Sequence, residues 1–192
     1  MRNVEILTQT RENIIDLQEL KDYLEITSTD KDNLLEKLID ASSDFVKDYT
    51  GYEWVETEYR ETIDGPGANS IVLSQRPVQE LTSVKVAGTE LEPDKYVVYE
   101  NEAIVTRKYN NFPQDLQNVE IQYTAGYTDV PGDVKQLCSE LVQVKLNSKE
   151  YEGLDAYSIG DEDIQFSKGG IPSDITSELE AKSKKRWWYY DW

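Results

Sequence analysis

Residues 30–51 read DKDNLLEKLIDASSDFVKDYTG. Apolar side chains recur along this stretch at the spacing of one face of a helix, over about four turns. Gly51 follows them, at the position where glycine commonly ends a helix. The stretch therefore predicts a helix over residues 30–50 whose apolar face must pack against other elements. The residues on that face are Leu34, Leu35, Leu38, Ile39, Ala41, Phe45, Val46 and Tyr49.

Two further helices are expected, one on either side of this one. Asp16 with Glu19 three residues later has the pattern of a capping box, which predicts a helix over residues 16–26. Pro131-Gly132-Asp133 precedes another run of apolar residues at helical spacing, which predicts a helix over residues 132–150. Cys138 lies on the apolar face of that run and is expected in the core.

Between residues 58 and 124 the pattern changes to short runs typical of β-strands. Turn signals, among them residues 64–67 and 87–89, separate the runs at intervals expected of antiparallel hairpins. The sequence therefore predicts an α+β fold, in which a small bundle of about three main helices carries an inserted small antiparallel β-domain. The six runs cover residues 59–64, 71–73, 81–86, 96–99, 103–106 and 119–123.

The composition changes again after Gly153. We expect a core over residues 1–153 and an extended C-terminal arm over residues 154–192, with a short helix from residue 173 to 185. Gly169 and Gly170 suit a hinge in this arm. The stretch with Ile159, Ile164 and Phe166 has two open interpretations: a strand added to a partner's sheet edge, or a strand folded back on its own domain.

The last six residues contain five aromatic side chains: Trp187, Trp188, Tyr189, Tyr190 and Trp192. Burying one such ring removes roughly 150–250 Å² from water, so the cluster is able to anchor a docked arm. Two other interpretations stay open. The cluster is a plain tail, or, because residues 184–186 are basic, a belt at a membrane interface.

The charge balance restricts the classes of partner. Acidic residues outnumber basic ones by 38 to 20, for a formal net charge of -18. The last twenty residues are neutral, so the excess belongs to residues 1–172. This balance argues against binding to a phosphate backbone, which needs local Lys and Arg. No apolar run reaches the roughly 20 residues that span a bilayer, so no membrane partner is expected.

The sequence offers little for catalysis. It has no histidine and one cysteine, so the commonest bases and activated nucleophiles are missing. Residues 161–163 are acidic but lack the ligand spacing of a calcium loop. The glycines form no phosphate-binding loop before a helix. We expect no enzyme, no catalytic or metal-binding residues and no cofactor.

Six segments carry a resemblance to a known family: residues 17–24, 48–51, 63–65, 73–78 with Ser83-Val84, 123–127 before Val130-Pro131, and 158–161. With these segments in this order and spacing along the sequence, the chain resembles the head-tail connector, or adaptor, proteins of long-tailed bacteriophages. The resemblance covers most of the chain. The aromatic end is not a feature of that family.

The resemblance implies a structural protein that forms a ring, twelvefold in the virion, beneath the portal. Its partners would be the portal protein, further copies of itself, and a neck, stopper or tail-completion protein. Genomic DNA would pass through the ring without sequence-specific binding, and an acidic ring would not retain it. The implied location is the head-tail interface of the virion, and the host cytoplasm during assembly.

The residues expected to dock on the portal are those of the arm, namely Ile159, Ile164, Phe166, Trp187, Trp188, Tyr189, Tyr190 and Trp192, with Gly169 and Gly170 as the hinge. The alternative hypothesis is a monomeric soluble binding module, for example for a carbohydrate. Such a module would use some of the chain's 20 aromatic residues on a β face.

Overall fold

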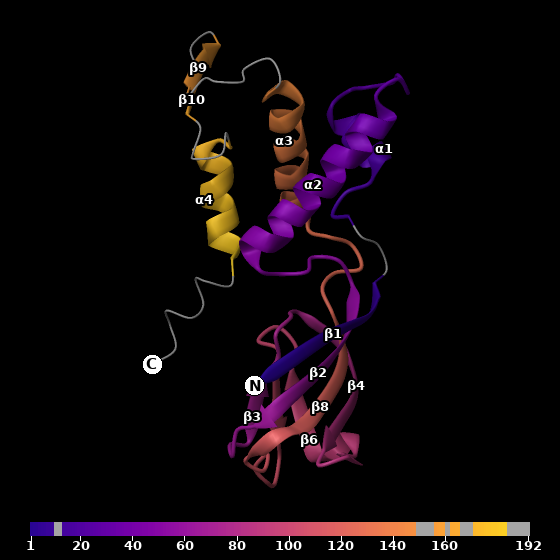
Figure 1. Cartoon of the computed structure of the whole chain (residues 1–192), viewed down its shortest axis with the longest axis vertical. Coiled ribbons are helices and arrows are strands. Elements are labelled where there is room, and N and C mark those ends of the chain that lie inside the picture. The colour runs from indigo at the N-terminus through magenta and orange to yellow at the C-terminus, as the bar shows by residue number, and fades with distance from the viewer. Residues whose placement is uncertain (10–12, 149–155, 160–161, 166–170, 184–192) are drawn as a thin grey trace. The chain divides into compact units, whose positions relative to one another are not determined.

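The computed structural model describes residues 1–9, 13–148, 156–159, 162–165 and 171–183. The chain divides into two compact units. Residues 1–11 and 53–129 form one of them, which we call the β unit, and residues 12–52 and 130–192 form the other, the helical unit (Figure 1). The predicted α+β class is confirmed.

Among its described residues, the helical unit contains the three predicted main helices and the short helix predicted from residue 173. Asp16 and Glu19 form the expected capping box at the start of the first helix, with N–H to carboxylate distances of 2.8 and 2.9 Å. This helix ends at Tyr23, short of residue 26, since Glu25 has a left-handed backbone with φ +55°. The helices are α1 (Leu17–Tyr23), α2 (Asp32–Thr50), α3 (Gly132–Ser148) and α4 (Ser173–Lys182).

Helix α2 is the centre of the helical unit and contacts α1, α3 and α4. It ends at Gly51, which has φ +74° and donates its N–H to the Lys47 carbonyl, as the sequence predicts. The predicted face is buried at Leu35, Ile39 and Val46, whereas Ala41 is exposed. Small polar residues take the remaining core positions of α2, namely Ser42, Ser43 and Thr50.

Helix α4 packs against α2 and α3. Its Ile175 and Leu179 are buried, and the Tyr49 hydroxyl donates to the Glu180 carboxylate at 3.2 Å. Residues 173–182, which the sequence places in the arm, are therefore part of the packed helical unit. Two short strands, β9 (Ala156–Ile159) and β10 (Glu162–Gln165), pair with each other in an antiparallel hairpin.

The β unit consists of two antiparallel sheets. The larger has the strand order β1-β2-β8-β4-β5, with β1 (Arg2–Gln9), β2 (Thr57–Gly65), β8 (Asp115–Ala125), β4 (Val78–Val86) and β5 (Thr89–Glu90). The smaller has the order β3-β7-β6, with β3 (Ser70–Val72), β7 (Ile104–Arg107) and β6 (Tyr96–Tyr99), the last preceded by a 3-10 turn at Pro93–Lys95.

All six predicted strand segments are present, and their inward side chains form one core. Tyr59 stacks on Tyr123 in this core with ring centroids 5.5 Å apart. The sequence did not predict β1, because most of its side chains are exposed and give no alternation of apolar and polar residues. The fully buried members of the core are Val84, Val105, Phe112, Val119, Ile121, Tyr123 and Ala125.

Candidate functional site

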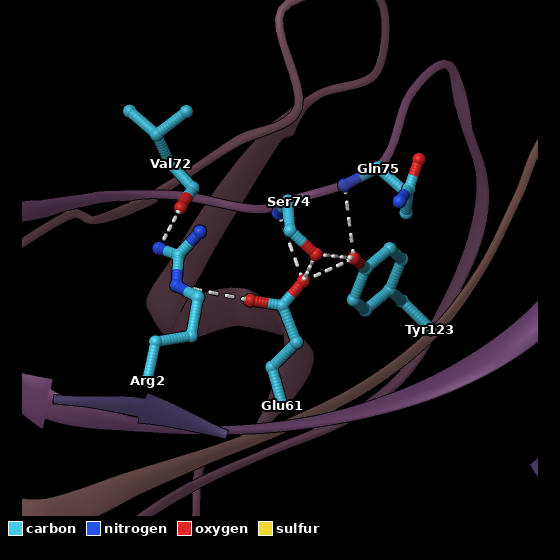
Figure 2. Close-up of polar contacts among 6 residues, drawn as sticks. All are labelled: Arg2, Glu61, Val72, Ser74, Gln75 and Tyr123. Atoms are coloured by element: carbon cyan, nitrogen blue, oxygen red, sulfur yellow. Dashed lines mark hydrogen bonds and ion pairs between the residues drawn. The ribbon is translucent and has the colours of Figure 1, made fainter. Parts of the chain in front are cut away.

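A carboxylate lies in the core of the β unit. Glu61 of β2 is fully buried, although it belongs to a strand whose neighbouring inward residues are Tyr59 and Ile63. Taking a carboxylate out of water costs several kcal/mol unless hydrogen bonds and a counter-charge replace its hydration. Figure 2 shows that Glu61 has both.

One carboxylate oxygen of Glu61 accepts three hydrogen bonds. The Ser74 N–H donates to Oε1 at 2.8 Å, and the Ser74 and Tyr123 hydroxyls donate to the same oxygen. The Gln75 N–H in turn donates to the Tyr123 hydroxyl at 3.2 Å. The loop after β3 is thereby fixed to β2 and β8 (Figure 2).

The other carboxylate oxygen faces Arg2 of β1. The Arg2 Nε lies 3.3 Å from Oε2, and its guanidinium also donates to the Val72 carbonyl of β3. Arg2 thus joins β1 to both sheets. Because both oxygens of Glu61 are engaged and neither reaches solvent, the cluster holds the fold together and presents no reactive group to a ligand.

Two tyrosines beside the cluster resist ionisation. Burial, together with the nearby Glu61 charge, holds the pKa of Tyr123 well above its ordinary value. The pKa of Tyr59 is raised as well, first by burial and then by the Glu53 carboxylate. A raised pKa in the folded state adds stability that is complete below the ordinary tyrosine pKa and is lost as the pH rises above it.

We therefore expect the β unit to lose about 2–3 kcal/mol of unfolding free energy between pH 8 and pH 11. Above about pH 10 these tyrosines ionise only in the unfolded chain, which costs about 1.4 kcal/mol per residue and pH unit. Urea unfolding at pH 8, 9, 10 and 11 measures this slope. The Tyr123→Phe variant should show a shallower slope above pH 10, and a stability that stays constant to pH 11 contradicts the interpretation.

Strand β1 forms an open edge of the larger sheet. It pairs with β2 on one side, and none of the described residues pairs with the other side. The Asp64 N–H donates to the Met1 carbonyl, so odd-numbered residues direct their backbone groups toward β2. The backbone groups of Arg2, Val4 and Ile6 therefore face the open edge.

The core face of the larger sheet is also uncovered along β1. Val4 lies opposite Glu61 and Ile6 lies opposite Tyr59, and paired residues of an antiparallel ladder point to the same face. Yet Val4 is 42% exposed and Ile6 54% exposed, whereas their partners on β2 are buried. The apolar core thus extends to an edge where nothing among the described residues covers it.

The outer face of the smaller sheet is a second exposed apolar surface. Val72, Ile104 and Tyr99 form one row across β3, β7 and β6, and Val97 of the next row lies on the same face. Val72 and Tyr99 are at least half exposed. Contiguous exposed apolar residues commonly mark sites of protein contact. The β unit therefore has two surfaces suited to assembly with other chains.

Comparison with known proteins decides the family. A sequence model of the head completion protein family matches residues 13–181. This chain belongs to that family. A head completion protein of Escherichia phage T5 is 24% identical over 171 residues, which cover 88% of this chain and 96% of that protein. The resemblance to a phage connector-type family is thereby confirmed at the level of the family.

Solved structures show the same fold. A chain in the neck of an empty gene transfer agent (GTA) particle, computed with C6 symmetry, matches with a TM-score of 0.65 and 15% identity, covering 94% of this chain and 95% of that one. A chain in the virion of the native gene transfer agent particle also matches at 0.65, with 14% identity and 94% coverage of both chains.

Several segments that carried the family resemblance have structural roles in the β unit. Ser74, Gln75 and Tyr123 meet at Glu61. A Cβ at Gly65 would lie 1.9 Å from the Pro113 carbonyl oxygen, and one at Gly126 would lie 2.3 Å from the Val55 carbonyl oxygen. These glycines are therefore required where two backbone segments approach closely.

Most of the predicted docking residues lie outside the described residues, so their role stays a prediction. Ile159 and Ile164 lie on β9 and β10, whose register pairs Ile159 with Glu162 and Ile164 with Tyr157. Outside the described residues are Phe166, Gly169, Gly170, Trp187, Trp188, Tyr189, Tyr190 and Trp192.

The sequence reasoning missed both Glu61 and the open edge of β1. Glu61 had a detectable signal, since a carboxylate at an inward position between Tyr59 and Ile63 must find partners.

Cys138 is buried as predicted, and burial raises the pKa of its thiol to about 11. In the part of the chain that the structure describes, no group of His, Cys, Asp and Glu is arranged to hold a metal ion. No helix of that part is long and apolar enough to cross a membrane.

Proposed function

We propose that the chain is a structural protein of the phage head and neck. We propose that it is a head-tail connector, forming a ring beneath the portal that joins the capsid to the neck and tail and lets DNA pass. Membership of the head completion family over residues 13–181 carries this proposal. The likeness to a chain in the neck of the native GTA particle, computed with C12 symmetry, adds to it, with a TM-score of 0.63, 15% identity and 94% coverage of both chains.

The charge of the chain suits a conduit. The net charge of -18 would give a ring an acidic field, and an acidic channel wall would not bind the phosphates of passing DNA. Like-charged subunits repel, so the contacts between copies must be apolar or locally neutral. No step of this role requires catalysis, so we propose that the protein is not an enzyme.

The docking element on the portal would be the C-terminal segment from residue 184 onward. This segment combines three basic residues with the aromatic cluster, in a chain that is otherwise acidic. Large aromatic side chains are the usual anchors of protein interfaces. The preceding Ser183 is buried and its N–H donates to the Glu180 carbonyl, so the packed helical unit extends to this residue.

We expect a chain that ends at Ser183 to fold normally and to bind purified portal rings at least tenfold more weakly than the full chain. Co-sedimentation with portal rings measures binding, and circular dichroism checks folding. The matched control changes Lys184, Lys185 and Arg186 to glutamine and keeps the aromatic residues. Unchanged binding by the shortened chain would refute the docking role of this segment.

A separate experiment tests the ring itself. Electron cryo-microscopy of the source particle, focused on the vertex that carries the tail, should show this chain as a ring below the portal. A vertex without the chain would overturn the proposed function, whatever result the chain ending at Ser183 gives in the binding assay.

A further inference from the structure

We propose that the open edge of β1 in one copy receives the β9–β10 hairpin of a second copy, so that the larger sheet continues from subunit to subunit. This inference rests on the proposed ring and names the contact that would join its copies. β1 supplies the acceptor edge, and β9 with β10 supplies the added strands.

The acceptor is a regular stretch of edge strand. Arg2, Val4 and Ile6 direct their backbone groups away from β2, and no described residue pairs with them there. The regular register ends with a bulge between Ile6 and Thr8, which leaves five residues for pairing. Extended segments bind such edges through main-chain hydrogen bonds, as in β-augmentation.

The acceptor has two features that protect edge strands in other proteins, the inward-facing Arg2 and the bulge after Ile6, but it has no proline or lysine within residues 2–6. Natural edges are commonly blocked by proline, lysine or charged residues that face inward. The charges of β1 are already neutralised within the unit, because Arg2 pairs with Glu61 and Glu5 lies 3.1 Å from Arg60. An added strand would therefore meet little net charge, which matters between copies that each carry -18.

Covering this edge would bury apolar surface that is now open. Val4 and Ile6 point to the core side of the sheet and are about half exposed. A strand added beside β1 would place its own inward side chains against them. The hydrophobic core would then extend over the edge, so main-chain pairing and apolar burial would act together.

The hairpin is suited to be the donor. β9 and β10 form a two-stranded sheet of their own, four residues to a strand, with no further strand paired to it among the described residues. Two-stranded hairpins are marginal in water and gain stability when a third strand or a packed face is added. Strands of four residues also match the five available residues of β1.

Donor and acceptor belong to different units of the chain. The hairpin belongs to the helical unit and β1 to the β unit, so each copy would donate through one unit and accept through the other. Such heterologous contacts close rings when the rotation permits, whereas pairing of β1 with β1 would stop at a two-fold dimer. A second copy is therefore the occupant that the topology favours.

A photo-cross-linking residue at position 6 tests the proposal in assembled particles. Ile6→benzoylphenylalanine changes an exposed side chain, and Leu116→benzoylphenylalanine, at a more exposed apolar position near the start of β8, is the control. From position 6 we expect a covalent dimer of the 22.1 kDa chain whose joined peptide contains residues 156–165. Cross-links to the portal, to another segment, within one chain, or none at all would overturn the pairing.

A backbone variant gives an independent test. Val4→Pro removes an N–H that faces the open edge and leaves the ladder to β2 intact, since odd-numbered residues make that ladder. Val4→Ala removes similar apolar surface and keeps the N–H. Incorporation into particles should fall at least tenfold for proline and less than threefold for alanine. Equal incorporation of the two variants would contradict the pairing, and thermal unfolding of each chain reports its folding.

The outcomes separate this inference from the proposed function. A particle neck that contains the chain but yields other cross-links from position 6 overturns the pairing and leaves the connector role standing. A neck that lacks the chain overturns the connector role. In that case the same cross-linking on the purified full chain at high concentration decides the pairing.

Discussion

Replacing Glu61 with alanine is expected to lower the unfolding free energy of the β unit by about 3–5 kcal/mol, in the range found when one partner of a buried ion pair is removed. The variant deprives three donors of their acceptor, namely the Ser74 N–H and the hydroxyls of Ser74 and Tyr123. It also removes the counter-charge of Arg2, which holds β1 on the sheet.

Trp54 provides the measurement. It is nearly buried in the β unit, where its ring stacks on Tyr127 with centroids 6.1 Å apart. In a chain ending at Ser183 it is the one tryptophan left, so its fluorescence during urea unfolding reports this unit alone.

Glu61→Gln is the matched control, because it keeps the shape and one acceptor oxygen and loses the charge. We expect a loss of about 1–2 kcal/mol, since hydrogen bonds to a neutral acceptor are weaker than those to a carboxylate. If alanine and glutamine cost the same small amount, the cluster does not hold the sheets together. The fixed position of β1 on the sheet would then need another explanation.

The comparison of sequence with structure shows which signals were informative. Apolar periodicity located α2 and the six strand segments, because their buried faces recur at regular spacing. It failed for β1, where Val4 and Ile6 are exposed on the core side and no face is fully buried. The arrangement of β1 depends on a contact with Glu61, 59 positions away in sequence, which no local pattern reveals.

A second difference between the predicted and the observed core of α2 concerns small side chains. Ala41 was assigned to the apolar face of α2 and is exposed, whereas Ser42 and Ser43 are buried. The Ser43 hydroxyl lies 3.7 Å from the Cys138 sulfur and 3.1 Å from the backbone nitrogen of Ile14. A serine with such partners occupies a core position at little cost, but a hydropathy pattern counts it as polar.

The packing of α4 could not be predicted from the sequence, because α4 is short and has only two buried apolar residues, Ile175 and Leu179. Its packing is nevertheless substantial, with Tyr49 and Asp133 contributing polar contacts to Glu180 and Lys182. A helix of this length would not be stable in water without the helices that it packs against.

Replacing Leu179 with alanine should therefore lower the unfolding free energy of the helical unit by about 2–5 kcal/mol, as for other fully buried leucines. Leu179 is completely buried between α4 and the helices against which α4 packs. Urea unfolding followed by circular dichroism at helical wavelengths measures the change. Glu178→Ala at an exposed position of the same helix is the control and should stay within about 0.5 kcal/mol of the parent. Equal effects of the two variants would mean that α4 belongs to the arm and does not contribute to the packing of the helical unit.

This result determines how the docking segment must be tested. A chain ending at Pro172 would lose Ile175 and Leu179 together and expose the faces of α2 and α3 that α4 covers. Such a chain would fail to bind a portal because its helical unit is destabilised, even if the aromatic cluster had no role. A chain ending at Ser183 keeps both residues and removes the cluster alone. If Leu179→Ala destabilises the unit as expected, only the truncation at Ser183 separates docking from folding.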